Sequence, residues 1–376
     1  MSPSVASVEV LPLRIPFRFA FAHHLAARRE ALPQVVRLRL SDGSVGYGES
    51  LPRPYLTGED EASVRAALAG PLAALVLGRT IDGLEGAGDL IGSAPARAAL
   101  EQAPAAFCGL ELALLDAAGK STGRSVSELL GGARRTDLPY DTAVIGFLPP
   151  AALRLFLAEV RRRGARLVKL KVGRPDDRER ATLVRRVLGD DVALVVDANA
   201  AWSAEEAVER VTELESFGLT AVEQPVARED VAGLARVRDL VDTPIMADES
   251  LCTRTDADRL LAADACDLWN LRVGKCGGLL ATLELARLAE TRGIGRVLGV
   301  LVGETGVLGA AGRQLAACHD FRWLEHEGAG LKSADPVILA PVVAGRAPWP
   351  AGPGLGLQMD EVRLAALAQD PQLVEA

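Results

Sequence analysis

The sequence predicts an α/β protein in which a barrel of seven or eight strand–helix units carries an additional, smaller α+β domain. From about residue 140 onward, short apolar runs alternate with helix-like segments, and repeated strand–helix units indicate a parallel sheet. Before residue 135 the order differs, because strand-like segments come first and helix-like segments follow. The length of 376 residues, about twice that of a typical single domain, has room for both parts.

Residues 1–135 are predicted to form the α+β domain, which is expected to be a capping domain for the barrel. Residues 35–40 partly alternate between apolar and polar side chains, and Ser-Asp-Gly at 41–43 is typical of a hairpin turn. From about 61 to 130 the apolar residues recur at helical spacing. Strands followed by helices favour a separate domain that covers the barrel rather than another barrel unit.

Residues 136–340 are predicted to form the barrel, a (β/α)7-8 fold of the TIM-like type. Seven or eight units fit a closed barrel better than an open sheet. The tail at 341–376 is rich in Pro and Gly, and we expect it to return to the first domain and complete it. The predicted barrel strands are 167–172, 193–196, 219–222, 244–247, 268–273, 297–302 and 321–325.

Composition and charge exclude several function classes. The net charge of −8 and an aromatic content of 4% speak against a nucleic-acid partner. The five cysteines form no C-x-x-C pair, so neither a zinc cluster nor a disulfide framework is expected. The amino terminus does not resemble a signal peptide, and no 18-residue apolar run occurs. We therefore expect a cytoplasmic protein with no membrane span.

One charged side chain follows each of five successive apolar runs. These residues are Lys171, Asp197, Glu223, Asp248 and Lys275, at intervals of 26, 26, 25 and 27 residues. One strand–helix unit has about this length, so each charge is expected at the C-terminal end of its own strand. Barrel enzymes hold their active sites at that end.

The types of these residues point to one kind of chemistry. Three carboxylates, Asp197, Glu223 and Asp248, make an oxygen-rich site for Mg²⁺, for which Mn²⁺ can substitute. Lys169 and Lys171 are two residues apart and so share one face of their strand, whereas Lys275 is expected to approach from the opposite side.

A metal flanked by two lysines suits removal of a proton next to a carboxylate. The metal would hold the carboxylate and stabilise the developing enediolate. A lysine must lose its proton to act as a base, and cationic neighbours would lower its pKa. With one lysine on each face, a proton can leave one side and return on the other, which inverts the carbon centre.

These residues resemble those of the enolase superfamily and, within it, of the mandelate racemase and muconate-lactonising-enzyme-like subgroup. The resemblance covers nearly the whole chain and includes Gly48-Glu49, Thr57-Gly58-Glu59 and residues 111–116 of the first domain. In the barrel the matching pieces are Lys169-x-Lys171, Asp197 with Asn199, Glu223-Gln224-Pro225, Asp248-Glu249-Ser250, and Lys275 followed by Gly277-Gly278.

The resemblance implies roles for these residues. Asp197, Glu223 and Asp248 would be the Mg²⁺ ligands, and Lys171 and Lys275 the opposed acid and base. Lys169 would bind the substrate carboxylate and lower the pKa of its neighbour, while Asn199 and Glu249 would support the site. Two loops of the first domain, 17–29 and 51–57, would close over the barrel mouth and set specificity.

The resemblance leaves the substrate open. Family members racemise or epimerise amino-acid derivatives and dipeptides, cycloisomerise muconate, or dehydrate to o-succinylbenzoate, all through the same kind of intermediate. Dipeptide epimerases carry Asp-x-Asp after the last strand, where this chain has Glu325-His326-Glu327, so a cationic substrate group can still be held. Glu304 resembles a substrate-facing position, although capping of the next helix explains it equally well.

We expect an isomerase that acts on a small-molecule carboxylate, either a two-lysine racemase or epimerase or a muconate-type cycloisomerase. A dehydratase on the same scaffold is a lyase alternative, and a non-catalytic relative is another. A metal-free Schiff-base lysine enzyme is disfavoured by the three carboxylates. Relatives tend to form homo-oligomers, which we expect here too. The roles of His23, His24 and His326 stay open.

Overall fold

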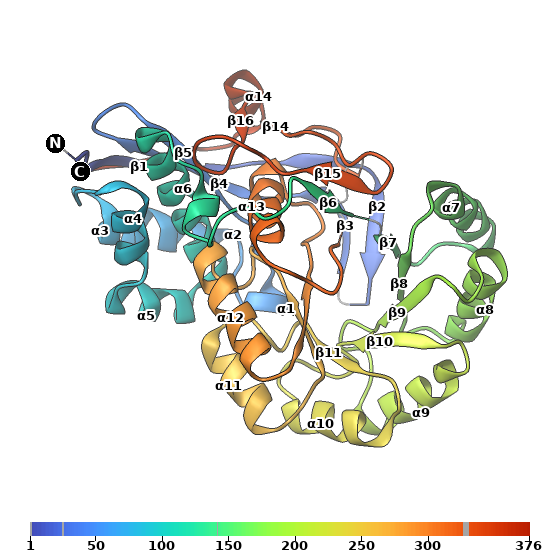
Figure 1. Cartoon of the computed structure of the whole chain (residues 1–376). Helices are drawn as coiled ribbons and strands as arrows, with labels where there is room; N and C mark the ends of the chain where they lie inside the picture. Colours follow the sequence, from blue (N-terminus) through green and yellow to red (C-terminus); the bar gives the residue numbers. More distant parts are fainter. Residues whose placement is uncertain (1, 25, 141, 326–330) are drawn as a thin grey trace.

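The computed structural model describes residues 2–24, 26–140, 142–325 and 331–376. The chain forms an antiparallel sheet at its amino-terminal end and a parallel sheet that curls into a barrel (Figure 1). Both features confirm the predicted fold class. The predicted domain boundaries at 135 and 340 stay predictions.

The antiparallel sheet has the strand order β17-β1-β4-β5. Its strands are β1 (Val5–Pro12), β4 (Gln34–Leu40), β5 (Val45–Ser50) and β17 (Gln372–Glu375). The carboxyl-terminal strand β17 pairs with β1, with Val8 opposite Val374, so the predicted return of the tail is confirmed. Both ends of the chain therefore lie side by side in this sheet (Figure 1).

Helix α6 (Pro104–Thr122) packs across this sheet and is buried along most of its length. An all-round apolar helix is buried on every side, which explains the run of Ala, Leu and Phe in α6. Gly46 and Gly48 of β5 allow the close approach, because a Cβ atom on Gly48 would lie 1.8 Å from the carbonyl oxygen of Gly109. The remaining helices of this part are α1 (Pro54–Thr57), α2 (Glu61–Ala67), the π-helix at Leu68–Leu72, α3 (Ala73–Val76), α4 (Gly83–Ile91), α5 (Ala94–Gln102) and the 3-10 turn at Val126–Glu128.

The parallel sheet has seven strands in the order of the chain, from β7 to β13. They are β7 (Thr142–Ile145), β8 (Leu167–Lys171), β9 (Ala193–Asp197), β10 (Leu219–Glu223), β11 (Ile245–Ala247), β12 (Leu268–Leu271) and β13 (Gly295–Leu298). The connecting helices cover the outside of the barrel (Figure 1): α7 (Pro150–Arg163), α8 (Asp177–Leu188), α9 (Ala204–Glu215), α10 (Val231–Leu240), α11 (Arg254–Ala262), α12 (Leu279–Thr291) and α13 (Gly306–Cys318).

The eighth place in the barrel is filled by a short segment rather than by a full strand. Leu324 forms an isolated bridge with Leu298 of β13, and its carbonyl oxygen accepts a hydrogen bond of 2.9 Å from Thr142 of β7. The prediction of a strand at 321–325 is therefore correct in position, but this segment forms an isolated bridge rather than a strand. The strand predicted at 297–302 is also displaced, because β13 ends at Leu298.

Alternation along the strands separates the barrel interior into an apolar layer and a polar layer. The apolar layer is the cluster Leu167, Val195, Ala221, Met246, Leu268, Val297 and Trp323. Alternate side chains of a strand point to the same face. Lys169, Asp197 and Glu223, each two residues further along its strand, therefore form the next layer.

The rest of the chain joins the two parts. The segment 17–29 is mostly a hairpin of β2 (Ile15–His23) and β3 (Ala26–Ala31) rather than a loop. The tail adds the pairs β6 (Asp137–Pro139) with β15 (Arg346–Pro348) and β14 (Val337–Ile338) with β16 (Gln358–Met359), and then α14 (Glu361–Leu367).

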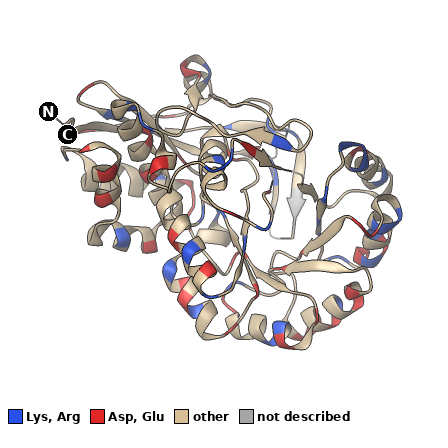
Figure 2. Cartoon of the chain, in the orientation of Figure 1, with Lys and Arg blue, Asp and Glu red and all other residues tan. Residues whose placement is uncertain are grey.

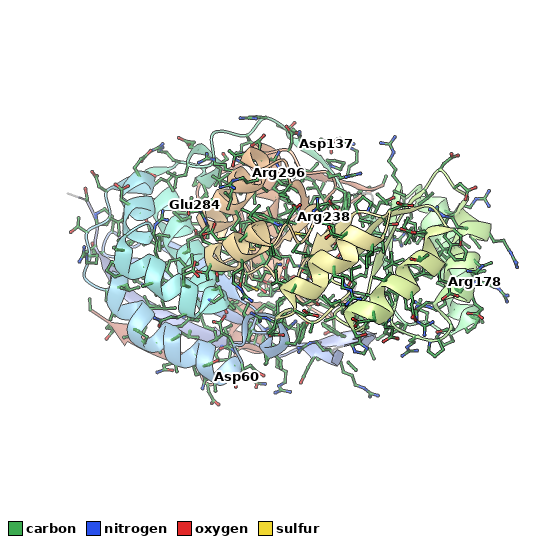
Figure 3. The ribbon with its side chains drawn as sticks, turned by 90° about the horizontal axis from the view of Figure 1, so that it is seen from below. Asp60, Asp137, Arg178, Arg238, Glu284 and Arg296 are labelled. Atoms are coloured by element: carbon green, nitrogen blue, oxygen red, sulfur yellow. The ribbon has the colours of Figure 1, made fainter. Side chains whose placement is uncertain are left out.

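Charged side chains of both signs are interspersed over the outer helices (Figure 2). Seen from below, labelled residues such as Arg178 of α8 and Arg238 of α10 lie on the outer helices (Figure 3). Within the described residues, no helix has the length and apolar character needed to cross a membrane. All five cysteines are buried free thiols.

Candidate active site

The structure gathers the predicted charged residues at one end of the barrel. Lys171, Asp197 and Glu223 are the last residues of β8, β9 and β10, and Asp248 directly follows β11. Lys275 lies four residues beyond β12, in the turn before α12, and not at a strand end as predicted. The side chains of all five are buried.

Two lysines share the carboxylate at one end of this series. Lys171 Nζ donates hydrogen bonds to Asp197 Oδ2 at 2.6 Å and to Asn199 Oδ1 at 2.8 Å. Lys169 Nζ lies 3.3 Å from Asp197 Oδ2, 2.6 Å from Glu223 Oε2 and 2.6 Å from Glu325 Oε1. Both ammonium groups therefore reach the same carboxylate, as their shared strand face predicts.

Lys275 lies at the other end. Its Nζ is 3.0 Å from Asp248 Oδ1 and donates hydrogen bonds to the carbonyl oxygens of Leu251, at 2.6 Å, and Asp248, at 2.5 Å. The two lysines predicted as acid and base thus contact the first and the last carboxylate, with Glu223 on the strand between them.

Arg272 is a site residue that the sequence reasoning missed. Its guanidinium lies 3.1 Å from Glu223 Oε1 and also donates a hydrogen bond to Asp248 Oδ2. Arg272 is the first residue after β12, the same place that Asp248 occupies after β11. This position directly after a barrel strand was the signal in the sequence that could have identified Arg272 as a site residue. Asn270 of β12 joins it by donating a hydrogen bond of 2.9 Å to Glu223 Oε1.

Hydrogen bonds connect the turns that follow the barrel strands. Asn199 Nδ2 donates a hydrogen bond of 2.9 Å to Glu249 Oε1, which links two residues predicted to support the site. Gln224 Oε1 accepts hydrogen bonds from the backbone N–H groups of Asp248 and Ser250, both at 3.0 Å. Asn199 and Gln224 have positive φ of 45° and 38°, and such strained backbone concentrates at functional sites.

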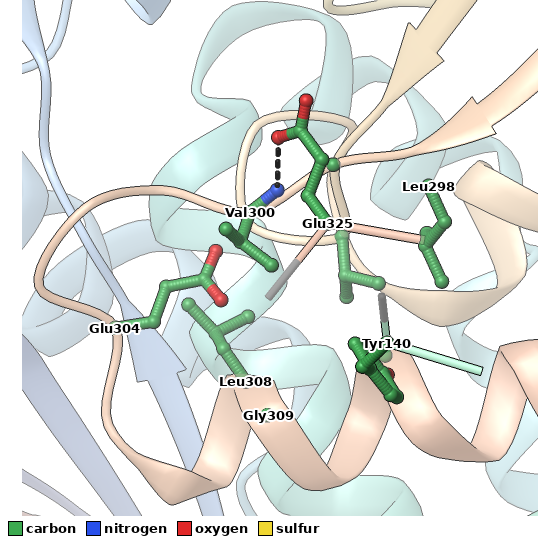
Figure 4. A pocket seen from close by; sticks show the side chains of 10 residues that line it. Tyr140, Leu298, Val300, Glu304, Leu308, Gly309 and Glu325 are labelled. Carbon is green, nitrogen blue, oxygen red and sulfur yellow. Dashed lines mark hydrogen bonds between the residues drawn. The ribbon is translucent and has the colours of Figure 1, made fainter. Parts of the chain in front are cut away.

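Glu304 and Glu325 line a small cavity beside the site, together with Tyr140 and Leu308 (Figure 4). Glu325 Oε2 accepts a hydrogen bond of 3.3 Å from Val300, and Glu304 Oε1 accepts one of 2.6 Å from Leu301. The helix-cap alternative for Glu304 is wrong, and its substrate-facing role stays a prediction. Glu304 lies in the loop after β13, and the side chain that caps α13 belongs to Thr305.

Glu327 and His326 lie outside the described residues. His24 is exposed, and its role stays open. The segment 51–57 reaches the barrel, because Arg53 donates a hydrogen bond of 2.7 Å to the carbonyl oxygen of Val302. Cys252, in the loop after β11, likewise donates from its thiol to the carbonyl oxygen of Leu56.

Burial and charge pairing act against each other in this site. Burial raises the pKa of Asp197, but the ammonium groups of Lys171 and Lys169 outweigh it, so that pKa lies below its ordinary value. Burial and then Asp197 raise the pKa of Glu223. Burial lowers the pKa of Lys275, yet Asp248 raises it above the ordinary value. The lowering of a lysine pKa by a bound metal and a second lysine stays a prediction.

The carboxylate oxygens have the character of ligands for a hard divalent cation. Glu223 Oε2, Asp248 Oδ1 and Glu249 Oε2 are buried, and they accept no hydrogen bond from the part of the chain that the structure describes. Lys169 and Lys275 lie close to the first two atoms, but these contacts lack hydrogen-bond geometry. Among the described residues, no three acidic, His or Cys side chains already converge on one ion-sized point. The donor set fits Mg²⁺ by its chemistry. The ammonium groups of Lys169 and Lys275 lie against its oxygens.

Comparison with protein families matches both parts of the chain. Residues 4–131 match the family described as "Mandelate racemase / muconate lactonizing enzyme, N-terminal domain", and residues 152–363 match "Enolase C-terminal domain-like". Muconate cycloisomerase 1 of Pseudomonas putida is 32% identical over 350 residues, which span 89% of this chain and 90% of that protein.

Two solved structures are similar over the full length of both chains. N-succinyl Arg/Lys racemase from Bacillus cereus has a TM-score of 0.92 at 25% identity. A dipeptide epimerase from Cytophaga hutchinsonii, complexed with Mg and the dipeptide D-Ala-L-Val, has a TM-score of 0.87 at 26% identity. The similar proteins thus include a racemase, an epimerase and a cycloisomerase.

Proposed function

The chain belongs to the enolase superfamily and is an isomerase of that family, and on this premise we propose that it racemises or epimerises an amino-acid derivative or dipeptide. In this proposal the proton next to a carboxylate leaves to one lysine and is returned by the other. One observation carries the proposal: Lys171 and Lys275 contact opposite ends of one series of buried carboxylates.

The residues of the chain divide the work. Asp197, Glu223 and Asp248 would hold Mg²⁺, which when bound would polarise the substrate carboxylate and stabilise the enediolate. Lys171 would take or give the proton on one face, and Lys275 would do so on the other. Lys169 would donate a hydrogen bond to the substrate carboxylate. Asn199 would hold the Lys171 ammonium in place through its 2.8 Å contact.

Glu325 and Glu304 would attract a cationic group of the substrate. Both line the small cavity, and Glu325 is buried and paired with Lys169 at 2.6 Å, so that group would lie close to the bound carboxylate. These carboxylates suit a racemase or epimerase whose amino-acid substrate carries a cationic group better than they suit an enzyme that acts on a dicarboxylate.

A muconate-type cycloisomerase is the second candidate. The observation in its favour is the 32% identity to muconate cycloisomerase 1 over most of both chains. That reaction would need one lysine as the acid or base rather than both.

Proton exchange in D₂O, followed by NMR, tests the proposal. The enzyme with Mg²⁺ is offered N-succinyl amino acids, dipeptides and cis,cis-muconate. We expect α-proton exchange with inversion on a member of the first two groups, and its loss on addition of EDTA. Lactone formation from muconate without such exchange would establish the second candidate. No exchange and no Mg²⁺ binding would overturn the ligand assignment.

Lysine variants test the two faces separately. Lys171→Ala and Lys275→Ala should each abolish racemisation, and each should still exchange the α-proton of one enantiomer, a different one in each variant. Full racemisation by Lys275→Ala would contradict the two-lysine mechanism.

A further inference from the structure

Lys275 depends on a tight turn for its position, because it does not lie on a barrel strand. The turn after β12 is closed by hydrogen bonds from Cys276 N to the carbonyl oxygen of Arg272 and from Gly278 N to that of Val273, both at 3.0 Å. Gly277 and Gly278 have φ of +84° and +107°, a region that favours glycine. The place of the lysine therefore follows from where α12 begins.

The start of α12 is bound by a glutamate of α6, the helix that packs on the antiparallel sheet. Glu111 of α6 is fully buried, and its oxygens accept hydrogen bonds from Leu279 N at 2.5 Å and from Leu280 N at 2.8 Å. The N-cap residue Gly278 has no side chain that could do this. The first N–H groups of a helix need outside acceptors and favour negative charge, so Glu111 replaces the missing cap.

The turn also fits closely against the same domain. A Cβ atom on Gly278 would lie 1.9 Å from Glu111 Oε2, and one on Gly277 would lie 2.8 Å from Leu100 Cγ of α5. At the surface, Arg97 of α5 pairs with Glu284 of α12 at 2.8 Å, and Figure 3 shows Glu284 where the two sets of helices meet. That exposed pair adds little energy. The buried contacts therefore carry the restraint.

We propose that Glu111 is a positioning residue for Lys275: from the capping domain it holds the turn that places this one base of the pair. Three residues separate Lys275 from the amide that Glu111 binds. Lys171 has a different support, since β8 is hydrogen-bonded on both sides to β7 and β9. Loss of Glu111 should therefore affect one face of the substrate. The proposal rests on the two-lysine function proposed above.

The test uses Glu111→Gln with Glu59→Gln as its matched control. Glu59 is also buried, and its oxygens accept hydrogen bonds from Ala105 N and Ala106 N at 2.8 and 2.9 Å, at the start of α6. Both substitutions preserve the side-chain volume and one acceptor oxygen. The new side-chain NH₂ group, however, faces a backbone N–H group whose hydrogen bond it cannot accept. Glu111 binds the residues that follow the turn of Lys275, whereas Glu59 binds the start of α6.

The α-proton exchange of each enantiomer is measured separately, on the compound that the wild-type enzyme racemises. Glu111→Gln should slow exchange of the enantiomer that Lys275→Ala abolishes by about tenfold or more, since a shift of about 1 Å can cost about a hundredfold. Exchange of the other enantiomer should change by less than about twofold on the same reasoning. Glu59→Gln should show no such asymmetry. Equal slowing of both enantiomers by Glu111→Gln, or no slowing, would overturn the proposal.

Two further measurements separate this proposal from the proposed function. If the lysine variants do not divide the enantiomers, the two-lysine function fails. Amide hydrogen exchange then still tests the positioning, because Glu111→Gln should raise deuterium uptake at 272–282 and leave 167–172 unchanged. Unchanged uptake at 272–282 would overturn it. If Glu111→Gln does not fold, Leu100→Ala removes the packing against Gly277 and should slow the same enantiomer.

Discussion

Lys169, Lys171 and Lys275 are buried cations, Arg272 is partly buried, and each of the four lies within ion-pair distance of a barrel carboxylate. A buried charge is tolerated when it is paired, and removing one partner leaves the other uncompensated. In the proposed function these carboxylates would therefore have two roles, because the oxygens suited to a divalent cation also neutralise the lysines. An added divalent cation would act on the lysine pKa in the direction opposite to Asp248.

Glu223→Gln should remove the stabilisation of the protein by Mg²⁺. Glu223 is the central carboxylate of the three proposed ligands, and Lys169 and Arg272 keep Asp197, Glu325 and Asp248 as partners when it is neutralised. At a hundred times its dissociation constant, a ligand stabilises the folded state by about 2.7 kcal/mol. Thermal unfolding with Mg²⁺ or EDTA measures this. Glu59→Gln should keep the wild-type response, and a full response from Glu223→Gln would contradict the ligand assignment.

The residues at strand ends could be predicted from sequence because alternation and unit length determine their place. Lys171, Asp197 and Glu223 close their strands as predicted. Arg272 could have been placed at the site by its position directly after β12, but its partner could not be predicted, because its long side chain reaches back over two strands to Glu223. The displacement of Lys275 into a turn also escaped, since β12 ends at Leu271 while the apolar run continues to Val273.

At the scale of elements, buried glutamates of the capping domain bind the starts of helices. Glu59 binds α6, Glu111 binds α12, and Glu49 accepts hydrogen bonds from Thr305 N at 2.9 Å and Leu308 N at 3.2 Å at α13. Two of the three contacts cross from the capping domain to the barrel. The sequence resemblance includes all three glutamates, but their partners lie too far along the chain for local patterns to predict.

Glu111 should make the stability of the protein depend on pH. Burial raises its pKa from 4.5 to about 8, although the two amide hydrogen bonds lower it. The folded protein then binds a proton that the unfolded chain has already lost, so the contribution of Glu111 to the unfolding free energy falls as pH rises from 4.5 to about 8. Urea unfolding should show the advantage of wild type over Glu111→Gln shrinking across this window. A constant difference would contradict the raised pKa.

Gly48→Ala should destabilise the packing of β5 on α6. The new methyl group would meet the carbonyl oxygen of Gly109 at 1.8 Å, and backbone cannot move aside as a side-chain end can. Overpacking of this kind costs about 1–3 kcal/mol. Gly312→Ala is the control, because a Cβ atom there meets nothing within 4 Å and α13 should gain about 0.5–1 kcal/mol. Equal unfolding free energies for the two variants would contradict the close approach.

At the scale of the whole molecule, the capping domain is built from both ends of the chain. Strand–helix order predicted the barrel and the separate first domain, and the composition of the tail indicated its return. The pairing partner of the tail could not be predicted, because β17 is only four residues long and mostly exposed, with no apolar pattern of its own. Its place depends on the free edge of β1, which is a property of the assembled sheet.

Removal of residues 371–376 should therefore loosen the capping domain while the barrel stays intact. The truncation takes away the partner of Ser7–Val10 and leaves β1 as an open edge, which favours association between molecules. Amide hydrogen exchange should rise in β1 and β4 and remain at its wild-type level in β8 to β11. Removal of Ala376 alone, which loses one hydrogen bond to the carbonyl oxygen of Ala6, serves as the control. Equal loss of protection in the barrel would show that the two parts unfold as one unit, and unchanged protection in β1 would show that β17 adds no stability.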